Sequence, residues 1–506
     1  MKILKKSLSI ILCIATIFSC VAFVASAAKK TDEKLPQIYV NGFGSRYLYY
    51  KDDPEKTSLF FPVNTDLMFA NLTNFTKYAG DSIKKGDYNL VYNHLYNAFW
   101  DTFGMTILEG DGITNANDNV VCEPTELSYD GNGIYDFKYD SRLSPIDLAD
   151  QLQSYIKKVQ KHSGSKRFEL VGASYGGDIV MAYLNEYPKM HKYIDSVVLS
   201  VPSYGGFSVV GELFSGNFHI DHNTLTEYAF VGINNEDLGL FLSVLNKSGF
   251  LKIFLEMLAI PAVKAIAIEA ATDVMRDIFA KIPCMWTFVQ EEYFYDAMVN
   301  LFGENYADPD HEYAEHIRKV IYYQENIMQR LDEVYRTAAR NDIKMNIICK
   351  YGRPPMPISR KGSFMSDGAV DVTDVTMGAV ASKYGEVLPD DYQQVRYTKR
   401  NFISPDNCID ASAGVDPYNT WYVKHLEHTE KNAGFVDLIN AIVYEDLHVF
   451  KNPKYPQFLE PTPDGGLTPV TGPDKKAETS LIEDTVALTK RLIELASTAI
   501  KGLFNK

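Results

Sequence analysis

Cysteine is scarce in this chain. Only six of its 506 residues are cysteines, and no two of them have the Cys-x-x-Cys spacing that is typical of zinc sites and dithiol redox centres. The sequence therefore gives no support to a zinc or redox site. The chemistry inferred below also needs no metal and no organic cofactor.

Basic residues are in short supply as well. The chain has 50 Lys and Arg against 65 Asp and Glu, which gives a formal net charge of −15. Binding to nucleic acid needs a basic face that neutralises phosphates, so the composition argues against a nucleic-acid partner. It also argues against simple electrostatic docking to an anionic membrane. The apolar content of 46 % is ample for a large core.

Long apolar runs are limited to the N-terminus. Residues 8–24 are predominantly apolar, follow three lysines and precede Ala25-Ser26-Ala27, which is the pattern of a cleaved secretory signal peptide. The run is too short to favour a permanent membrane span. We therefore predict a signal peptide over residues 1–27, cleavage near Ala27 and secretion. Loss of the three lysines would bring the net charge to −18.

Four cysteines would remain after this cleavage. In an extracellular chain they can form two disulfides, with three possible pairings, or remain as buried thiols. Their positions in the sequence do not decide between these outcomes. They are Cys122, Cys284, Cys349 and Cys408.

Short apolar, β-branched stretches alternate with helix-like stretches from about residue 34 to residue 201. Such alternation predicts an α/β fold with a mostly parallel central sheet and helices on both faces. The predicted strands are 36–40, 167–171, 196–201, 345–351 and 421–423, the last of which we interpret as the final core strand. The predicted helices begin at 145, 179 and 435.

The segment 208–339 breaks this rhythm, because its apolar residues recur at helical spacing and its aromatic residues cluster near 286–295. We interpret it as a helical cap inserted into one domain that spans residues 28–460. Residues 461–478 are rich in Pro and Gly and predict a linker. Residues 479–506 predict an amphipathic helix, which either packs on the domain or binds a lipid surface or a partner.

The strongest motif is Gly172-Ala173-Ser174-Tyr175-Gly176, between a predicted strand and a predicted helix. In this context G-x-S-x-G forms a sharp turn that lifts a nucleophilic serine oxygen out of the sheet. Ser174 is therefore the predicted nucleophile. Ser203-Tyr204-Gly205-Gly206 has similar letters but lacks the preceding glycine, so we interpret it as a loop that lines the acyl pocket.

Attack by a serine produces an oxyanion, which two backbone N–H groups commonly bind. The residue after the nucleophile provides one of them, so Tyr175 is the first candidate. The second comes from a loop after an early strand, and Asn41-Gly42-Phe43-Gly44 has that form. We predict the Phe43 N–H as the second donor, and the alternative is an ordinary glycine turn.

The serine also needs a base and an orienting acid, which follow it in the order acid, then histidine, in this class of fold. Asp367 lies beside Gly368 after the strand 345–351 and is the predicted acid. Asp371 and Asp374 are nearby alternatives, and a simple turn aspartate remains a further interpretation.

Two histidines lie just beyond the predicted strand 421–423. His428 is the predicted base because it lies further into the loop, and His425 is the alternative. Their His-x-x-His spacing could also indicate a metal pair on a helix, but no other ligand cluster in the sequence supports one.

These motifs together resemble the lecithin–cholesterol acyltransferase family of α/β-hydrolases. Residues 136–145 (DFKYDSRLSP) are similar to an aromatic-Asp-x-Arg-Leu-x-Pro segment of that family, and 172–177 are similar to its nucleophile turn. Residues 194–206 resemble its strand and glycine-rich loop, and 367–370 with His428 resemble its acid and base. Ser141 stands where the family usually has Trp, and 207–340 matches nothing in it.

The resemblance implies the α/β-hydrolase fold, a lipid ester as substrate and a triad of Ser174, Asp367 and His428. It also implies a disulfide between Cys349 and Cys408. We therefore expect a secreted serine hydrolase that cleaves or transfers the ester-linked acyl groups of lipids. The alternatives are a carboxylesterase for non-lipid esters and an inactive binding protein on the same fold. The expected partner is the lipid ester itself, at a membrane or micelle surface, and the sequence does not identify a protein partner.

Overall fold

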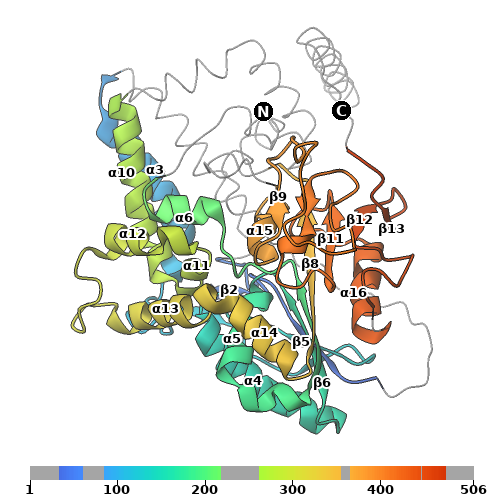
Figure 1. Ribbon diagram of the computed structural model, residues 1–506. Coiled ribbons are helices and arrows are strands. Elements are labelled where there is room, and N and C mark those ends of the chain that lie inside the picture. The colour runs from blue at the N-terminus through green and yellow to red at the C-terminus, as the bar shows by residue number, and fades with distance from the viewer. Residues whose placement is uncertain (1–33, 61–84, 218–260, 355–364, 446, 474–506) are drawn as a thin grey trace, which may run out of the picture.

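A nine-stranded sheet forms the centre of the molecule in the computed structural model (Figure 1). The structure describes residues 34–60, 85–217, 261–354, 365–445 and 447–473, so the predicted signal peptide and C-terminal helix lie outside the described residues. In spatial order the strands are β13 (Leu467–Pro469), β12 (Phe458–Pro461), β11 (Thr420–Lys424), β8 (Lys344–Tyr351), β7 (Ile194–Ser200), β6 (Phe168–Ala173), β1 (Gln37–Val40), β5 (Ile134–Phe137) and β4 (Ser128–Tyr129).

The seven inner strands, from β12 to β5, are parallel, and only the two edge strands are antiparallel. Their shared direction brings the carboxyl ends of β6, β8 and β11 to one edge of the sheet, where loops leave toward the predicted triad residues. The α/β class, the mostly parallel sheet and the flanking helices are confirmed.

Alternating side chains of the strands divide the core in two, as the period of two in a strand requires. On one face, side chains such as Ile38, Leu170 and Ile347 join the larger core cluster. Their neighbours Tyr39 and Val171 point to the second cluster on the other face. Strands buried on both faces explain the nearly continuous apolar runs in the sequence.

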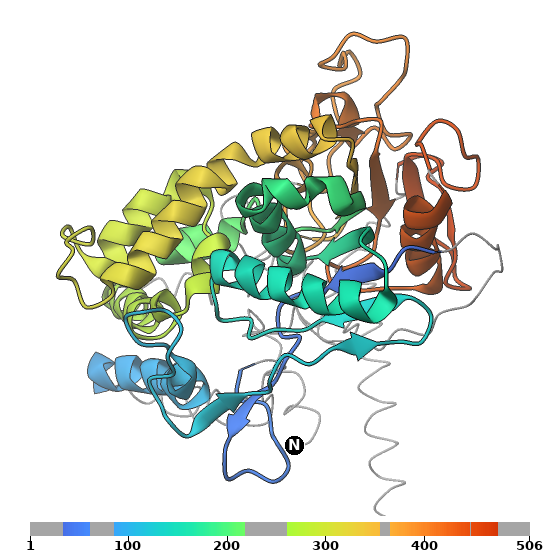
Figure 2. The same cartoon turned by 90° about the horizontal axis from the view of Figure 1, so that it is seen from below.

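Helices cover both faces. The larger core is covered by α4 (Pro145–Ser163), α5 (Tyr175–Glu186) and α14 (Leu331–Arg340), which lie side by side (Figure 2). The second face packs against α16 (Ala433–Glu445). Local signals set the ends of α4, because the Ser144 side chain accepts the Asp147 N–H and Gly164 takes the left-handed conformation after the last turn.

Every regular element that the structure describes between β7 and β8 is a helix. Figure 1 shows most of these helices beside the sheet, where α10 packs against α3 (Tyr88–Phe103). The last of them, α14, instead contacts α5 and β8 and covers the sheet. The other helices are α6 (Ser208–Phe214), α10 (Pro261–Asp277), α11 (Pro283–Thr287), α12 (Glu291–Phe302) and α13 (Ala314–Asn326).

Short elements complete the described chain. Two small antiparallel pairs join β2 (Leu48–Tyr50) to β3 (Val120–Cys122) and β9 (Val380–Ala381) to β10 (Ile409–Asp410), and α15 (Val372–Val375) precedes β9. No helix among the described residues is both long and apolar enough to cross a membrane. The 3₁₀ helices are η1 (Gly104–Thr106), η2 (Pro188–Tyr193), η4 (Phe279–Lys281), η5 (Met328–Arg330) and η6 (Ala411–Ala413).

The described tail differs from the sequence prediction. Strand β11 is not the last strand, because β12 and β13 follow it and form an antiparallel hairpin. Residues 461–469 of the predicted linker 461–478 therefore belong to this hairpin, in which Pro461 ends β12 and Leu467–Pro469 form β13. Its Pro and Gly residues serve the turn, where Gly465 has φ 83° and Thr462 accepts the Gly465 N–H. Val470 is buried and anchors the hairpin.

Candidate active site

Ser174 occupies the turn between β6 and α5. Its backbone has φ 52° and ψ −125°, a conformation that a residue with a Cβ rarely adopts. Such strain costs about 1–3 kcal/mol and is typically found at functional sites. The surrounding structure holds the turn, because the Ser174 N–H donates to the Ser200 carbonyl and the Gly177 N–H donates to the Ser174 carbonyl.

The glycines around this turn are required by close packing of backbone on backbone. A Cβ on Gly176 would lie 2.1 Å from the Val40 carbonyl oxygen, and a Cβ on Gly172 would lie 2.7 Å from the Gly176 carbonyl oxygen. Neither clash can be relieved by a side-chain rotation. The small residues that the motif predicts therefore seat α5 against β6 and β1 and place the serine at the sheet edge.

The predicted triad residues form one hydrogen-bonded chain. Ser174 Oγ lies 2.7 Å from His428 Nε2, and His428 Nδ1 lies 2.7 Å from Asp367 Oδ2. The three residues are distant in sequence, and their exposed fractions are only 7 %, 4 % and 1 % in the order Ser174, His428, Asp367. The arrangement orders the imidazole so that its Nε2 can accept the serine proton.

The environment of Asp367 favours its ionised form. Burial opposes ionisation, but His428 and backbone N–H donors prevail and lower the pKa of Asp367 below its usual value. The carboxylate oxygen that does not face the histidine accepts the N–H groups of Ala369 and Val370, at 3.0 and 2.8 Å. A carboxylate that is fixed in this way can orient His428 and stabilise its protonated form.

The alternative acid and base residues lie elsewhere. Asp374 accepts a hydrogen bond from Gln290 Nε2 at 2.6 Å, and Asp371 stands at the start of α15. His425 has φ 66° and forms the turn after β11, where its N–H donates to the Tyr351 carbonyl. The structure therefore brings Asp367 and His428, and not these alternatives, to Ser174.

The predicted oxyanion loop lies directly against Ser174. A Cβ on Gly42 would lie 3.3 Å from Ser174 Cβ, and the next glycine, Gly44, donates its N–H to Ser141 Oγ at 2.8 Å. Tyr175 is the first residue of α5, so its N–H belongs to the helix turn that has no intrahelical acceptor. Both predicted N–H donors thus come from backbone segments that adjoin the serine.

A cluster of aromatic side chains packs beside His428. The Phe207 ring lies 6.2 Å from the His428 ring and stacks on Phe288 at 4.7 Å. Phe43 contacts both Phe288 and Tyr175, at 5.9 and 6.2 Å between centroids. All of these side chains are buried, so the cluster adds an apolar wall next to the histidine that bonds to Ser174.

Ser203 lies in the loop whose local sequence is similar to that around Ser174, but it is not part of the hydrogen-bonded chain of Ser174, His428 and Asp367. Its side chain is fully buried and donates to Asp178 Oδ2 at 2.6 Å. The loop instead reaches the triad through Phe207, which contacts His428. The geometry thus agrees with the interpretation of this segment as a loop at a strand end.

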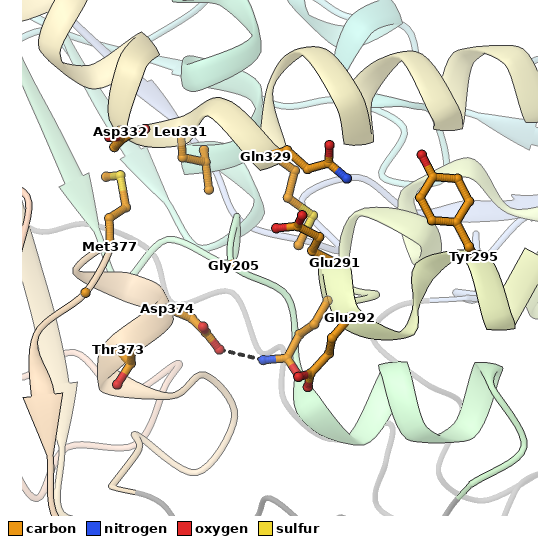
Figure 3. Close-up of a pocket in the computed structure, with 13 residues that line it drawn as sticks. Gly205, Glu291, Glu292, Tyr295, Gln329, Leu331, Asp332, Thr373, Asp374 and Met377 are labelled. Atoms are coloured by element: carbon orange, nitrogen blue, oxygen red, sulfur yellow. Dashed lines mark hydrogen bonds between the residues drawn. The ribbon is translucent and has the colours of Figure 1, made fainter.

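A cavity of about 660 Å³ borders the outer side of the same loop at Gly205 (Figure 3). Its lining comes from the start of α12, η5, α14 and α15, and it includes Gln290 and Asp374, which are joined by a hydrogen bond. Three further carboxylates line it, from Glu291, Glu292 and Asp332. Ser174, His428 and Asp367 are not among the residues that line this cavity.

Sequence reasoning missed Lys350. This lysine lies inside β8, is fully buried and donates to backbone carbonyls of the loop that carries His428. A signal was present, because the charged residue stands within the apolar strand MNIICKY. A lysine in a strand that is buried on both faces must find polar partners in the protein interior.

The disulfide between Cys349 and Cys408 is not formed, and the four cysteines of the described residues are thiols. Cys349 Sγ lies in the core, 3.4 Å from the Lys350 carbonyl oxygen. Cys408 Sγ lies 3.5 Å from the Asp406 carbonyl oxygen. Burial raises the pKa of Cys349 well above its ordinary value and so disfavours its reactive thiolate form.

Comparisons with known proteins identify no relative. No protein-family model matches the chain, and neither the curated proteins nor the solved structures give a match. The interpretation of the site therefore depends on its geometry and on the motifs in the sequence.

Proposed function

We propose that this chain is a serine hydrolase with the α/β-hydrolase fold that cleaves or transfers ester-linked acyl groups. The observation that carries the proposal is the buried Ser174–His428–Asp367 chain, with both hydrogen bonds at 2.7 Å. The strained turn at Ser174 and the order of the three residues along the chain support it.

The proposed reaction begins with attack of Ser174 Oγ on the ester carbonyl carbon, while His428 Nε2 accepts the serine proton. Asp367 holds the imidazole tautomer and stabilises its positive form. The N–H groups of Phe43 and Tyr175 bind the oxyanion, a contribution of about 3 kcal/mol for each well-placed donor. His428 then protonates the leaving alcohol, and water or an acceptor alcohol releases the acyl group from Ser174.

We propose lipid esters as the substrate class. The buried aromatic rings of Phe43, Phe207 and Phe288 beside the triad suit an apolar acyl chain. The motif resemblance to the lecithin–cholesterol acyltransferase family points in the same direction, and the signal-peptide pattern supports action outside the cell. The negative net charge favours an approach to lipid that depends on apolar contacts.

The test is ester hydrolysis by the purified chain on short p-nitrophenyl esters, phospholipid and triacylglycerol. Ser174→Ala should lower the rate about 10⁴-fold or more, because the nucleophile is lost. Ser203→Ala is the matched control, since it changes a serine in a similar local sequence and should keep most of the activity. A rise in rate when the substrate forms micelles would separate a lipid enzyme from a non-lipid esterase. Equal rates for Ser174→Ala and the unchanged chain would refute the proposal.

A further inference from the structure

The buried ammonium group of Lys350 makes three hydrogen bonds, all to one loop. Its Nζ donates to the backbone carbonyl oxygens of Glu427 at 2.8 Å, His428 at 3.0 Å and Glu430 at 2.6 Å. These contacts use all three donors of an ammonium group. The ring of Phe435 lies 4.5 Å from the same nitrogen and covers a further side of it.

The His428 backbone is consequently held from two sides. Its N–H donates to the Asp367 carbonyl at 3.1 Å, and its carbonyl accepts from Lys350 at 3.0 Å. Lys350 itself is fixed within β8, where it pairs in register with Val423 of β11. Strand β8 thus fixes the position of the loop that holds the His428 imidazole next to Ser174.

Lys350 also belongs to the electrostatic environment of the acid. It is one of the charges that lower the pKa of Asp367. Burial lowers the pKa of Lys350 to about 7, against the opposing effect of Asp367 and of Glu430 and Glu427. The lysine and the triad carboxylate therefore favour each other's charged forms.

We propose that Lys350 is a positioning residue that keeps the His428 loop at hydrogen-bonding distance from Ser174, an inference that rests on the proposed serine mechanism. The lysine does not touch the reacting atoms. It acts through the three carbonyls, so its loss displaces the imidazole without removing it. A displacement of about 1 Å at a reacting group can lower a rate about 100-fold.

A second buried lysine provides the control. Lys424 lies on the adjacent strand β11, in register with Tyr351, and is 2 % exposed. Its Nζ lies 2.9 Å from Asp406 Oδ2 in a buried ion pair. Replacement of either lysine by methionine removes a buried charge from a core strand, but the hydrogen bonds of Lys350 go to the His428 loop whereas the ion pair of Lys424 goes to Asp406.

The experiment measures kcat and KM on a soluble short-chain ester for Lys350→Met, Lys350→Gln and Lys424→Met. Lys350→Met should lower kcat about 100-fold with little change in KM. Lys350→Gln should fall between it and the unchanged chain, because the shorter amide can donate to some of the carbonyls, and it keeps the test valid if the methionine variant fails to fold. Lys424→Met should lose stability while its kcat stays within about threefold.

Crystal structures of the same variants decide the question independently of activity. The distance from Ser174 Oγ to His428 Nε2 should exceed the hydrogen-bond limit of about 3.5 Å in Lys350→Met and remain short in Lys424→Met. A folded Lys350 variant with an unchanged distance and unchanged kcat would overturn the inference. An unchanged chain that hydrolyses no ester would overturn the proposed function instead, and the distance would still report on the role of Lys350.

Discussion

Two fully buried aspartates near the nucleophile have opposite ionisation behaviour. Asp367 faces His428 and backbone N–H groups, and these partners outweigh burial and lower its pKa. Asp178, on helix α5 just after Ser174, accepts hydrogen bonds from the hydroxyls of Ser203 at 2.6 Å and Tyr323 at 3.3 Å and from the backbone N–H groups of Asp178 and Ser203. Burial raises its pKa to about 8, because these uncharged donors do not compensate for the lost hydration of the carboxylate.

The difference separates two uses of a buried carboxyl group. The Asp367 site is built to keep a negative charge beside an imidazole, which is what a triad acid requires. The Asp178 site joins α5 to the 203–207 loop and to α13 (Ala314–Asn326), and a neutral carboxyl group serves this purpose equally well. The first site is therefore expected to control activity and the second to control stability.

Replacement of the triad aspartate, Asp367, is expected to have the largest effect on kcat. Asp367→Asn removes the charge but keeps the shape, so kcat should fall about 10³- to 10⁴-fold through loss of the correct histidine tautomer. The matched change Asp178→Asn should keep kcat within about tenfold, because this residue does not touch the triad. Hydrolysis of a soluble ester by both variants is the measurement. A comparable loss of kcat in the two variants would remove the distinction between the sites.

The next largest effect concerns the free energy of unfolding, whose pH dependence should change in opposite directions in Asp178→Asn and Asp367→Asn. The folded pKa of Asp178 is raised to about 8. Its contribution to the free energy of unfolding is therefore fully present below its unfolded pKa of about 3.8 and is lost as the pH rises to about 8. Asp178→Asn should gain stability relative to the unchanged chain over this range, and urea unfolding at about pH 5, pH 7 and pH 9 measures the gain.

Asp367 acts in the opposite sense because its folded pKa is lowered. Its contribution is present above the unfolded pKa and is lost as the pH falls through the folded pKa. Asp367→Asn should therefore lose more stability at neutral than at acid pH. Parallel pH profiles for the two asparagine variants would contradict the assignment of opposite pKa shifts.

The smallest effect is expected when one of the two hydroxyl donors to Asp178 is removed. Tyr323→Phe removes the weaker of its two hydroxyl donors, from α13, and should lower the free energy of unfolding by about 1 kcal/mol. Ester hydrolysis should be unchanged. Thermal or urea unfolding of the phenylalanine variant provides the measurement, and a large loss of kcat with intact stability would instead tie α13 to the catalytic site.

The sequence predicts local features well at the site. Strands β1, β6, β7, β8 and β11 are visible as apolar runs, and the turn at Ser174 is visible because its glycines and flanking elements are adjacent in the chain. The partners Asp367 and His428 could be proposed because each follows a recognisable strand. Their distances to Ser174 depend on the register of the whole sheet and could only come from the structure.

Long-range pairings account for what the sequence did not predict. Lys350 donates hydrogen bonds to a loop that is distant in the sequence, and its partner Glu430 is 80 positions away. The hairpin of β12 and β13 has the Pro and Gly content of a linker, since a tight turn and a linker use the same residues. The free thiol of Cys349 follows from the direction of its side chain in β8, which spacing in sequence does not reveal.

The central claim is that Ser174 is an activated nucleophile. The most direct measurement is reaction of the intact chain with a fluorophosphonate ester, followed by mass spectrometry of the modified peptide. A single adduct is expected on Ser174, which is abolished in Ser174→Ala and strongly slowed in Asp367→Asn but formed at a similar rate in Asp178→Asn. An adduct on another residue, or equal labelling of Ser174 in the two asparagine variants, would contradict it.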